Sequence, residues 1–489
     1  MDVFARRRAG ILLHPTSLPG DGGNGDLGMD AYRFVDFLVD CGIGLWQTLP
    51  LGPTHDDLSP YQCLSVHAGN SRLINLQALV EQGWLDDAGL DTSGDINGQR
   101  KLRLTAAHDG FERHASPEDR EALGRFAREH AVWLDDFALY QALRTENGGK
   151  PWFRWPRAVC DRRADALVRE RERLAKQIEQ VRFEQFLFYR QWTQLRHYAN
   201  ERGVLLFGDI PIFVAHDSAD VWAHREWFSV DEHGNSQVVA GVPPDYFSST
   251  GQRWGNPHYR WDALEQDGYR WWLDRIRSQM EMFDLVRIDH FRGFEAYWEI
   301  DARAETAVDG RWVQGPGARF FEALAEDLGA LPLVAEDLGV ITPEVTALRQ
   351  RFGLPGMKIL QFAFDGSPNN PYLPHQHEPL SVVYTGTHDN NTTLGWYQEL
   401  PEDERQRLHH YLGECSEAMP WLLVRTALAS VARLAVVPMQ DVLGLDGSHR
   451  MNVPGVTQGN WRWRFSWDQV QEEHRARLRD WVHLYGRAE

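Results

Sequence analysis

Residues 284–289 read Asp-Leu-Val-Arg-Ile-Asp, a short apolar run that ends in a carboxylate. Similar β-branched or apolar runs, each stopped by polar residues, recur along the whole chain, which is typical of parallel strands buried on both faces. They lie at 10–13, 45–51, 204–207, 284–288, 331–335, 357–362, 381–385 and 434–439. Helical patterns lie between several of them, as at 31–39, 318–328 and 422–434. Eight strands alternating with helices predict a closed (β/α)8 barrel of the TIM-barrel class.

Unequal gaps between the runs indicate two long insertions. Segment 53–202 consists mostly of charged helical patterns, so we expect a helical insertion subdomain after the second strand. Segment 211–269 is rich in Gly, Trp and Pro, and we expect a loop-rich insertion after the third strand that lines the active-site cleft. No repeat or low-complexity linker separates a second domain. Residues 1–489 are therefore expected to form a single catalytic α/β barrel with long, largely helical insertions at its C-terminal rim.

The composition excludes several classes of function. Lys and Arg number 51 against 70 Asp and Glu, a net charge of −19, and no basic block follows Arg6–Arg8, so we expect no nucleic-acid partner. The four cysteines lie far apart without a CxxC pair, which argues against disulfides and zinc and favours a reducing compartment. No apolar run is long enough for a membrane span, and the run after Arg8 is too short for a signal peptide. We expect a cytoplasmic protein with no metal, no other cofactor, no membrane contact and no obligate protein partner.

Carboxylates follow most of the predicted strands at the point where each strand ends. They are Asp209, Asp289, Glu336 with Asp337, Asp389 and Asp441. In a barrel these strand ends surround one cavity. A single Asp after a strand is often a turn or cap residue, which is our interpretation of Asp441. Several carboxylates without lysine partners would repel one another, so Asp289, Glu336 and Asp389 together indicate a catalytic site.

Glycoside chemistry gives such carboxylates a purpose, because one attacks the anomeric carbon while a second protonates the departing oxygen. Arg287 lies two residues before Asp289, so both side chains share one face of the strand. A cation there would keep Asp289 ionised, as a nucleophile requires. A plain structural ion pair is the alternative interpretation of Arg287.

Other functions fit parts of the sequence. Residues 20–25 match the GxGxxG pattern, but no acidic residue follows the next strand at 45–52, which disfavours a dinucleotide site. The only Gly-Lys pair, 149–150, is followed by proline, which argues against a P-loop. Carboxylates on strand ends could hold Mg²⁺ in an enolase-type lyase or isomerase, but that chemistry needs a Lys or His base and no Lys ends a predicted strand. A glucan-binding protein without catalysis is the remaining alternative.

Four stretches resemble the conserved regions of a known family. They are 208–222 (GDIPIFVAHDSADVW), 287–293 (RIDHFRG), 335–339 (AEDLG) and 387–390 (THDN), and they are similar to those of the 4-α-glucanotransferases, or amylomaltases, a branch of the α-amylase superfamily. Shorter similarities run from end to end, at 10–19, 59–62, 243–247, 254–257, 355–358, 450–455 and 460–461.

The resemblance implies a retaining enzyme that cleaves α-1,4-glucans through a covalent glucosyl-enzyme and transfers the glycosyl unit to the 4-OH of another glucan or of glucose. It implies Asp289 as the nucleophile, Glu336 as the general acid/base and Asp389 as a third carboxylate that steadies the distorted donor sugar. Periodicity alone does not choose Glu336 over Asp337. The resemblance further implies that Tyr61 stacks under the donor glucose, that Tyr246 and Phe247 lie on a loop over the cleft, and that other contacts come from Asp209, Trp254, Arg287, His290, His388 and Asn460.

One stretch departs from the family pattern. Residues 55–58 read His-Asp-Asp-Leu, where the family commonly has a Gly/Tyr/Gly/Asp-like turn. The aromatic platform that some members carry there for a second glucan contact is missing. This departure bears on the binding of long or cyclic glucans and leaves the core chemistry unaffected.

Overall fold

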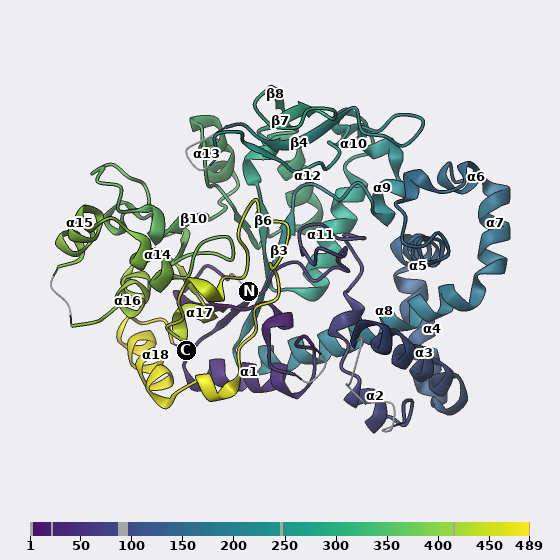
Figure 1. The fold of residues 1–489 in the computed structure, drawn as a ribbon, viewed down its shortest axis with the longest axis horizontal. Coiled ribbons are helices and arrows are strands. Elements are labelled where there is room, and N and C mark those ends of the chain that lie inside the picture. Colours follow the sequence, from purple (N-terminus) through teal and green to yellow (C-terminus); the bar gives the residue numbers. More distant parts are fainter. Residues whose placement is uncertain (1–2, 21–22, 87–95, 245–247, 414–415, 489) are drawn as a thin grey trace.

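Eight parallel strands form the centre of the molecule (Figure 1), whose computed structural model describes residues 3–20, 23–86, 96–244, 248–413 and 416–488. The strands are β1 (Arg8–Leu12), β2 (Leu45–Gln47), β3 (Leu205–Pro211), β6 (Leu285–Asp289), β9 (Leu333–Ala335), β10 (Gly356–Ile359), β11 (Ser381–Tyr384) and β12 (Leu434–Pro438). Their order is β10-β11-β12-β1-β2-β3-β6-β9. A 2.9 Å hydrogen bond from Ala335 N to Pro355 O links the two end strands and nearly closes the ring. The predicted barrel is confirmed, and each predicted run overlaps one of its strands.

The barrel interior is filled by side chains that alternate with those facing the helices. One packed cluster takes a residue from every strand: Leu12, Leu45, Phe207, Leu285, Val334, Met357, Val382 and Leu434. Strand neighbours such as Leu206 and Val286 pack in a second cluster under the helices. Both faces of the strands are therefore buried, as continuous apolar runs predict. Asp209 and Arg287 lie two residues beyond Phe207 and Leu285, so they continue the inward-facing rows to the C-terminal rim.

Seven α-helices lie among the described residues between β2 and β3, on the right of Figure 1. They are α2 (Gln77–Glu81), α3 (Ile96–His114), α4 (Pro117–Glu129), α5 (Ala131–Glu146), α6 (Arg157–Cys160), α7 (Ala164–Arg173) and α8 (Ala175–Glu201). Local signals set their ends: α4 begins with Ser116 as its cap, accepting from Asp119 N over 3.1 Å, and with Pro117 at its first position. The long α8 buries Trp192, Leu195 and Ala199 near its C-terminal end and contacts β3. It therefore serves both as a barrel helix and as part of the insertion.

The segment after β3 differs from the loop-rich insertion that we expected, because it contributes to a second sheet at the top of Figure 1. This antiparallel sheet has the order β5-β4-β7-β8, from β4 (Val238–Val242), β5 (Gln252–Arg253), β7 (Ala296–Asp301) and β8 (Gly310–Gln314). Val239 of β4 and Ile300 of β7 pack in a small core of their own. The pairing joins segments on either side of β6, and no local periodicity reveals such a partner.

The remaining helices complete the outer layer. They are α1 (Met29–Asp40), α9 (Ala219–Ala223), α10 (Trp261–Gln266), α11 (Arg270–Met282), α12 (Ala318–Leu328), α13 (Pro343–Arg351), α14 (Thr393–Glu399), α15 (Glu402–Leu412), α16 (Trp421–Ala429), α17 (Met439–Val442) and α18 (Glu472–Leu484). The helical pattern predicted at 422–434 ends earlier, at Ala429, because the chain turns there to enter β12 at Leu434. Between β10 and β11, residues 360–380 form 3-10 turns instead of an α-helix.

Several sequence features take their places in this fold. The apolar run after Arg8 is the buried strand β1. Cys41, Cys63 and Cys160 are free thiols, and Cys415 lies outside the described residues. In the described ranges, no helix combines the length and apolar character needed to cross a membrane.

Candidate active site

Arg287 joins two carboxylates at the C-terminal rim of the barrel. Asp209 on β3 is the register partner of Arg287 on β6. The guanidinium donates from Nη1 to Asp209 Oδ2 over 2.6 Å and from Nη2 to Asp289 Oδ1 over 2.7 Å. Burial alone lowers the pKa of Arg287, but the two carboxylates raise it above its usual value, so the side chain stays charged. The Asp289 side chain is 30% exposed and that of Asp209 only 1%, so a substrate can reach Asp289 more easily.

Asp209 is held from two sides below the rim. Tyr61 donates its hydroxyl to Asp209 Oδ2 over 2.7 Å, at the same oxygen that accepts from Arg287. Burial raises the pKa of Asp209 to about 6 against the opposing effect of Arg287. The other oxygen, Oδ1, is buried and has no partner in the described part of the chain. Since an unpaired buried acceptor costs free energy, this oxygen is suited to accept a hydrogen bond from a ligand hydroxyl.

Glu336, directly after β9, reaches the same rim. Its carboxylate accepts backbone hydrogen bonds from His290 over 2.6 Å and from Leu338 over 3.0 Å, so it lies beside the peptide that follows Asp289. Burial, with a further contribution from the charge on Asp289, raises the pKa of Glu336 to about 8. A carboxyl group with this pKa holds its proton at neutral pH, as a general acid requires.

Asp337 has a structural role, which separates it from Glu336. Its Oδ1 accepts from Met357 N over 2.7 Å, and its Oδ2 pairs with Arg349 Nε at 3.1 Å. These bonds tie β10 and α13 to the end of β9. Asp441 is likewise occupied, since it accepts from the backbone N and the hydroxyl of Thr393 over 2.8 and 2.6 Å. These bonds are structural, although Asp441 lies within α17 and not at its cap.

Asp389 lies in the loop after β11 and is held by its neighbour His388 and by residues 450–452. Its Oδ1 accepts from Asn452 Nδ2 over 2.7 Å, and its Oδ2 lies 3.4 Å from His388 Nε2. Arg450 donates to the backbone oxygen of Asp389 over 2.9 Å. Burial acts in the opposite direction, but His388 and Asn452 hold the pKa of Asp389 well below its usual value, so the carboxyl group is ionised. The sequence analysis missed Asn452 and Arg450 as contacts, although stretch 450–455 carries part of the family resemblance.

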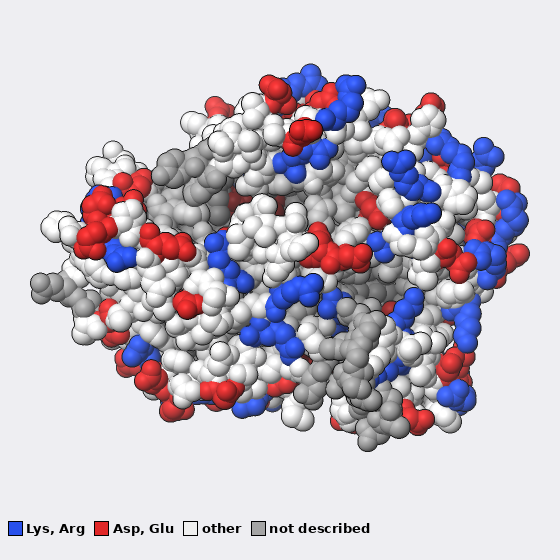
Figure 2. Space-filling view, viewed as in Figure 1, with Lys and Arg blue, Asp and Glu red and all other residues white. Residues whose placement is uncertain are grey.

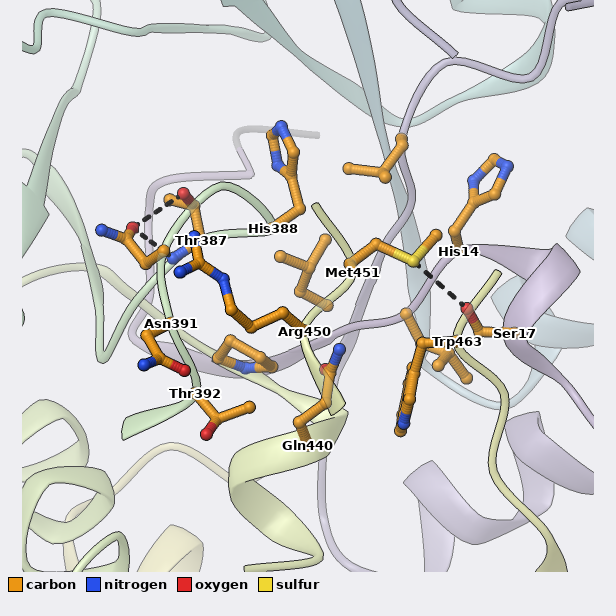
Figure 3. A pocket seen from close by; sticks show the side chains of 15 residues that line it. His14, Ser17, Thr387, His388, Asn391, Thr392, Gln440, Arg450, Met451 and Trp463 are labelled. Atoms are coloured by element: carbon orange, nitrogen blue, oxygen red, sulfur yellow. Dashed lines mark hydrogen bonds between the residues drawn. The ribbon is translucent and has the colours of Figure 1, made fainter. Parts of the chain in front are cut away.

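Aromatic rings give this site a flat wall. The Tyr61 and His388 rings stack with centroids 5.0 Å apart and an interplanar angle of 16°. Trp461 lies 6.0 Å from the Tyr61 ring and 5.9 Å from that of His388. Figure 3 shows an adjoining pocket lined by His388 and His14, with Met451 between them. Apolar ring faces of this kind are surfaces against which the C–H groups of a sugar can pack.

His290 shapes the turn that follows Asp289. Its backbone is left-handed, with φ 56° and ψ 47°, a conformation uncommon outside glycine. In this conformation its own N–H donates to Glu336. Burial lowers the pKa of His290 to about 3, so the ring is neutral, and its Nε2 is buried with no partner among the residues described. Trp254 packs edge-on against the ring with centroids 4.8 Å apart.

The side chain of Asn460 bonds to the backbone of its own loop. Its Oδ1 accepts from Val453 N over 2.9 Å and its Nδ2 donates to Val456 O over 2.9 Å, which closes the loop 453–460. Tyr246 and Phe247 lie outside the described residues. The other predicted site residues form a continuous series of contacts: Tyr61, Asp209, Trp254, Arg287, Asp289, His290, Glu336, His388 and Asp389.

The site also bears on the alternative functions. Asp209 Oδ2 and Asp289 Oδ1 accept hydrogen bonds from Arg287. The enolase-type hypothesis predicts that these carboxylates bind Mg²⁺, and it does not predict an arginine between them. Within the described ranges, no three His, Cys, Asp or Glu side chains gather as metal ligands. The barrel order of the strands differs from that of a doubly wound dinucleotide-binding sheet, so the dinucleotide interpretation of residues 20–25 is wrong.

Comparisons with known proteins identify the family. The model of the 4-alpha-glucanotransferase family matches residues 13–470. The chain is 52% identical over 487 residues to the 4-alpha-glucanotransferase of Thermus thermophilus, covering 97% of each chain, and 46% identical to that of a Synechocystis species, covering 99% of each. The amylomaltase from Streptococcus agalactiae, solved in complex with acarbose, has a TM-score of 0.96 at 37% identity, covering 99% of this chain and 100% of that one. The chain belongs to the 4-alpha-glucanotransferase family, and it is a transferase acting on α-1,4-glucans.

Proposed function

We propose that the enzyme transfers glucan segments by double displacement through a covalent glucosyl-enzyme on Asp289. The observation that carries this proposal is the contrast between two neighbouring carboxyl groups. Asp289 pairs with the charged Arg287, and Glu336 holds its proton at neutral pH. One group is thus suited to attack as an anion and the other to protonate a leaving oxygen, which is the division of roles in a retaining enzyme.

In the first step, Asp289 bonds to the anomeric carbon of the donor glucose while the bond from that carbon to the glycosidic oxygen breaks. Glu336 gives its proton to the departing oxygen. In the second step, the 4-OH of an acceptor glucan or of glucose attacks the same carbon, Glu336 takes the hydroxyl proton, and the bond to Asp289 breaks. Glycosylation removes the charge on Asp289, which is one cause of the raised pKa of Glu336. Its pKa therefore falls between the steps, and the acid becomes a base.

The surrounding side chains are suited to hold the donor glucose. We infer that Tyr61 packs against the sugar ring, that Asp209 Oδ1 and His290 Nε2 bond its hydroxyls, and that the ionised Asp389 with His388 steadies the distorted ring. Unpartnered buried polar atoms support the roles of Asp209 and His290, since a bound hydroxyl satisfies them. The contacts of Asn460 within loop 453–460 favour an indirect role for this residue.

We further propose that the whole chain works as one cytoplasmic catalytic unit, with the helical segment 53–202 and the segment 211–269 as insertions. A hydrogen bond supports our proposal that segment 211–269 lines the cleft. Gln62, the residue after Tyr61, donates from Nε2 to Asn256 Oδ1 in this segment over 3.1 Å. The proposed partners are a glucan donor and a glucan or glucose acceptor.

Incubation with maltotriose tests the proposed activity. We expect a ladder of longer maltooligosaccharides together with free glucose, because a sugar hydroxyl resolves the intermediate. Chromatography of the products at early times measures the ratio of transfer to hydrolysis. Maltose and glucose alone, with no longer product, would show a hydrolase and contradict the proposal.

The loop at 240–255 provides a second test. If Tyr246 and Phe247 cover the acceptor side and exclude water, changing both to Ala raises the ratio of hydrolysis to transfer by about tenfold, because water then competes better for the intermediate. Reducing-sugar release and glucose release in the same reaction measure the ratio. Val239→Ala, in the small core of the second sheet, is the control for a general loosening of this region. An unchanged ratio in a folded double variant would leave the two aromatics without this role.

A further inference from the structure

A second pocket adjoins the aromatic wall of the active site and has a different character. Its cavity volume is about 100 Å³. Three arginines line it, Arg72, Arg462 and Arg464, together with small polar residues. The described residues around it include no Asp or Glu. Figure 2 shows Lys and Arg side chains gathered near the centre of this face, in the region that the yellow C-terminal segment of Figure 1 crosses.

Two of these arginines lack a counter-charge in the described structure. Arg462 is exposed and forms no ion pair or hydrogen bond there, and the closest bond of the Arg72 side chain is a 3.5 Å contact with Asn24 Oδ1. Arg72 Nε is buried without a partner among the described residues. Burial, and then the charge on Arg462, lowers the pKa of Arg72. The two cations therefore repel each other, which costs free energy. The chain as a whole carries a net charge of −19, so two neighbouring arginines without an acidic partner are unusual for its surface.

The pocket is held in shape by the glycine-rich turn that precedes α1. Asn24 donates from Nδ2 to Arg72 O over 3.1 Å, and Arg464 donates from Nη2 to Gly20 O over 2.5 Å. Gly25 has to be glycine, because a Cβ there would lie 2.2 Å from Pro15 O. Gly25, the last glycine of the dinucleotide-like pattern, is therefore required by close packing, and Asn24 beside it lines the arginine-rich pocket.

The pocket also borders the proposed active site. Trp461, which lies 6.0 Å from the Tyr61 ring and 5.9 Å from that of His388, also lines this pocket, as does Pro60. A ligand in the pocket would therefore lie behind the wall against which the donor glucose packs.

We propose that this pocket is an anion subsite for a phosphate group, carried either by a sugar or by free inorganic phosphate. Guanidinium N–H groups match the oxygens of phosphate in geometry and charge, and a phosphate between Arg72 and Arg462 satisfies both cations at once. The asparagine and threonine side chains around the pocket supply the hydroxyl and amide contacts that an attached sugar requires. This site is additional to the glucan transfer at Asp289 and does not depend on it.

Titration calorimetry of the full chain with sodium phosphate, at constant ionic strength in chloride, tests the subsite. We expect saturable binding that weakens at least about tenfold in Arg72→Gln and in Arg462→Gln, since each removes a charge-assisted contact. Arg125→Gln is the matched control, because Arg125 is an exposed arginine on α4 that does not line the pocket, and it keeps the parent affinity. Arg462 is exposed, so its variant is expected to fold even if the Arg72 variant does not.

Glucose 6-phosphate and glucose in the same assay distinguish the two sources of phosphate. The readout is the difference in binding affinity between the parent and Arg462→Gln. Binding of a sugar ring at the active site contributes equally to both proteins, so it does not affect this difference. If the variant loses more affinity for glucose 6-phosphate than for phosphate, the ligand of the pocket is a phosphorylated sugar. If the loss is equal or smaller, the ligand is free phosphate. The proposal would be overturned by no saturable binding of either anion, by a phosphate affinity in both arginine variants equal to that of the parent, or by a loss of affinity for glucose in Arg462→Gln as large as the loss for the two anions. None of these results depends on turnover, so they are separate from a failure of the maltotriose test.

Discussion

Asp289→Asn is expected to lower kcat on maltotriose by about 10⁴-fold or more, because an amide cannot form the glucosyl-enzyme. The change barely alters the volume of the side chain, and the amide oxygen can still accept from Arg287, whose Nη2 lies 2.7 Å from Asp289 Oδ1. Folding and maltotriose binding should therefore stay close to those of the parent. Steady-state kinetics measure kcat, and calorimetry measures the Kd of maltotriose.

Asp403→Asn provides the control for this variant. Asp403 is an exposed carboxylate on α15 that pairs with Arg407 at 2.7 Å, so the same chemical change there leaves kcat unchanged. Labelling with a mechanism-based fluoroglucoside tests the nucleophile independently, because the trapped sugar remains on the attacking oxygen. Mass spectrometry should find the label on the peptide that contains Asp289. A label on Asp209 or Asp389 would contradict the assignment.

The choice between Asp289 and Asp209 depends on burial, since both accept from Arg287. Asp209 shares its Oδ2 between Tyr61 and Arg287 and is almost fully buried, so attack on a substrate carbon would require breaking these bonds. Asp289 gives one oxygen to Arg287 and its side chain remains partly exposed. Tyr61 and Asp209 thereby orient Arg287, and Arg287 orients Asp289, the proposed nucleophile.

The barrel could be predicted from the sequence because each of its strands carries a local signal. Runs such as 434–439 are apolar on both faces, and this pattern needs no knowledge of the neighbouring strand. The second sheet carries no comparable signal. Its strand β8 is mostly exposed, and β4 pairs with β7 across a segment that contains a barrel strand. Pairing of this kind is determined by tertiary contacts that periodicity does not report.

The site shows the same limit at the level of single residues. Asp209, Arg287 and Asp289 could be predicted, since they end strands whose C-terminal ends meet at one rim. The choice of Glu336 over Asp337 could not be made from periodicity, because the difference lies in the bonds of Asp337 to Met357 N and Arg349. The contacts by which Asn460 closes its own loop could not be predicted either. An asparagine in a loop looks the same in the sequence whether its amide contacts a ligand or the backbone.

Glu336 governs the pH dependence of both proposed steps. Its pKa of about 8 in the free enzyme means that the acid form predominates at neutral pH and is lost as the pH rises through 8. Turnover of maltooligosaccharides should therefore fall on the alkaline side. The two backbone N–H groups that bond its carboxylate favour the ionised form, so loss of the charge on Asp289 after glycosylation shifts the balance toward the base.

Glu336→Gln is expected to lower kcat on maltooligosaccharides by about 10³-fold or more, because no proton reaches the departing oxygen. Glucosyl fluoride, whose leaving group needs no proton, should still glycosylate Asp289 at a rate near that of the parent. The intermediate should then persist, since no base activates the acceptor hydroxyl, and the alkaline loss of activity should disappear from this first step. Burst kinetics of fluoride release and mass spectrometry of the intact protein measure both effects.

Azide distinguishes the loss of this base from a general disturbance of the site. As a nucleophile that needs no base, it should release the trapped sugar from Glu336→Gln as glucosyl azide, whereas Asp289→Asn should give no such product because it forms no intermediate. His290 N and Leu338 N bond different oxygens of Glu336, so the single amide oxygen of Glu336→Gln can keep one of these two hydrogen bonds but not both. Parent-like turnover of maltooligosaccharides in this variant would move the acid/base role to another carboxylate. Asp337 would be tested first, and its bonds to Met357 N and Arg349 would then have to break during the reaction.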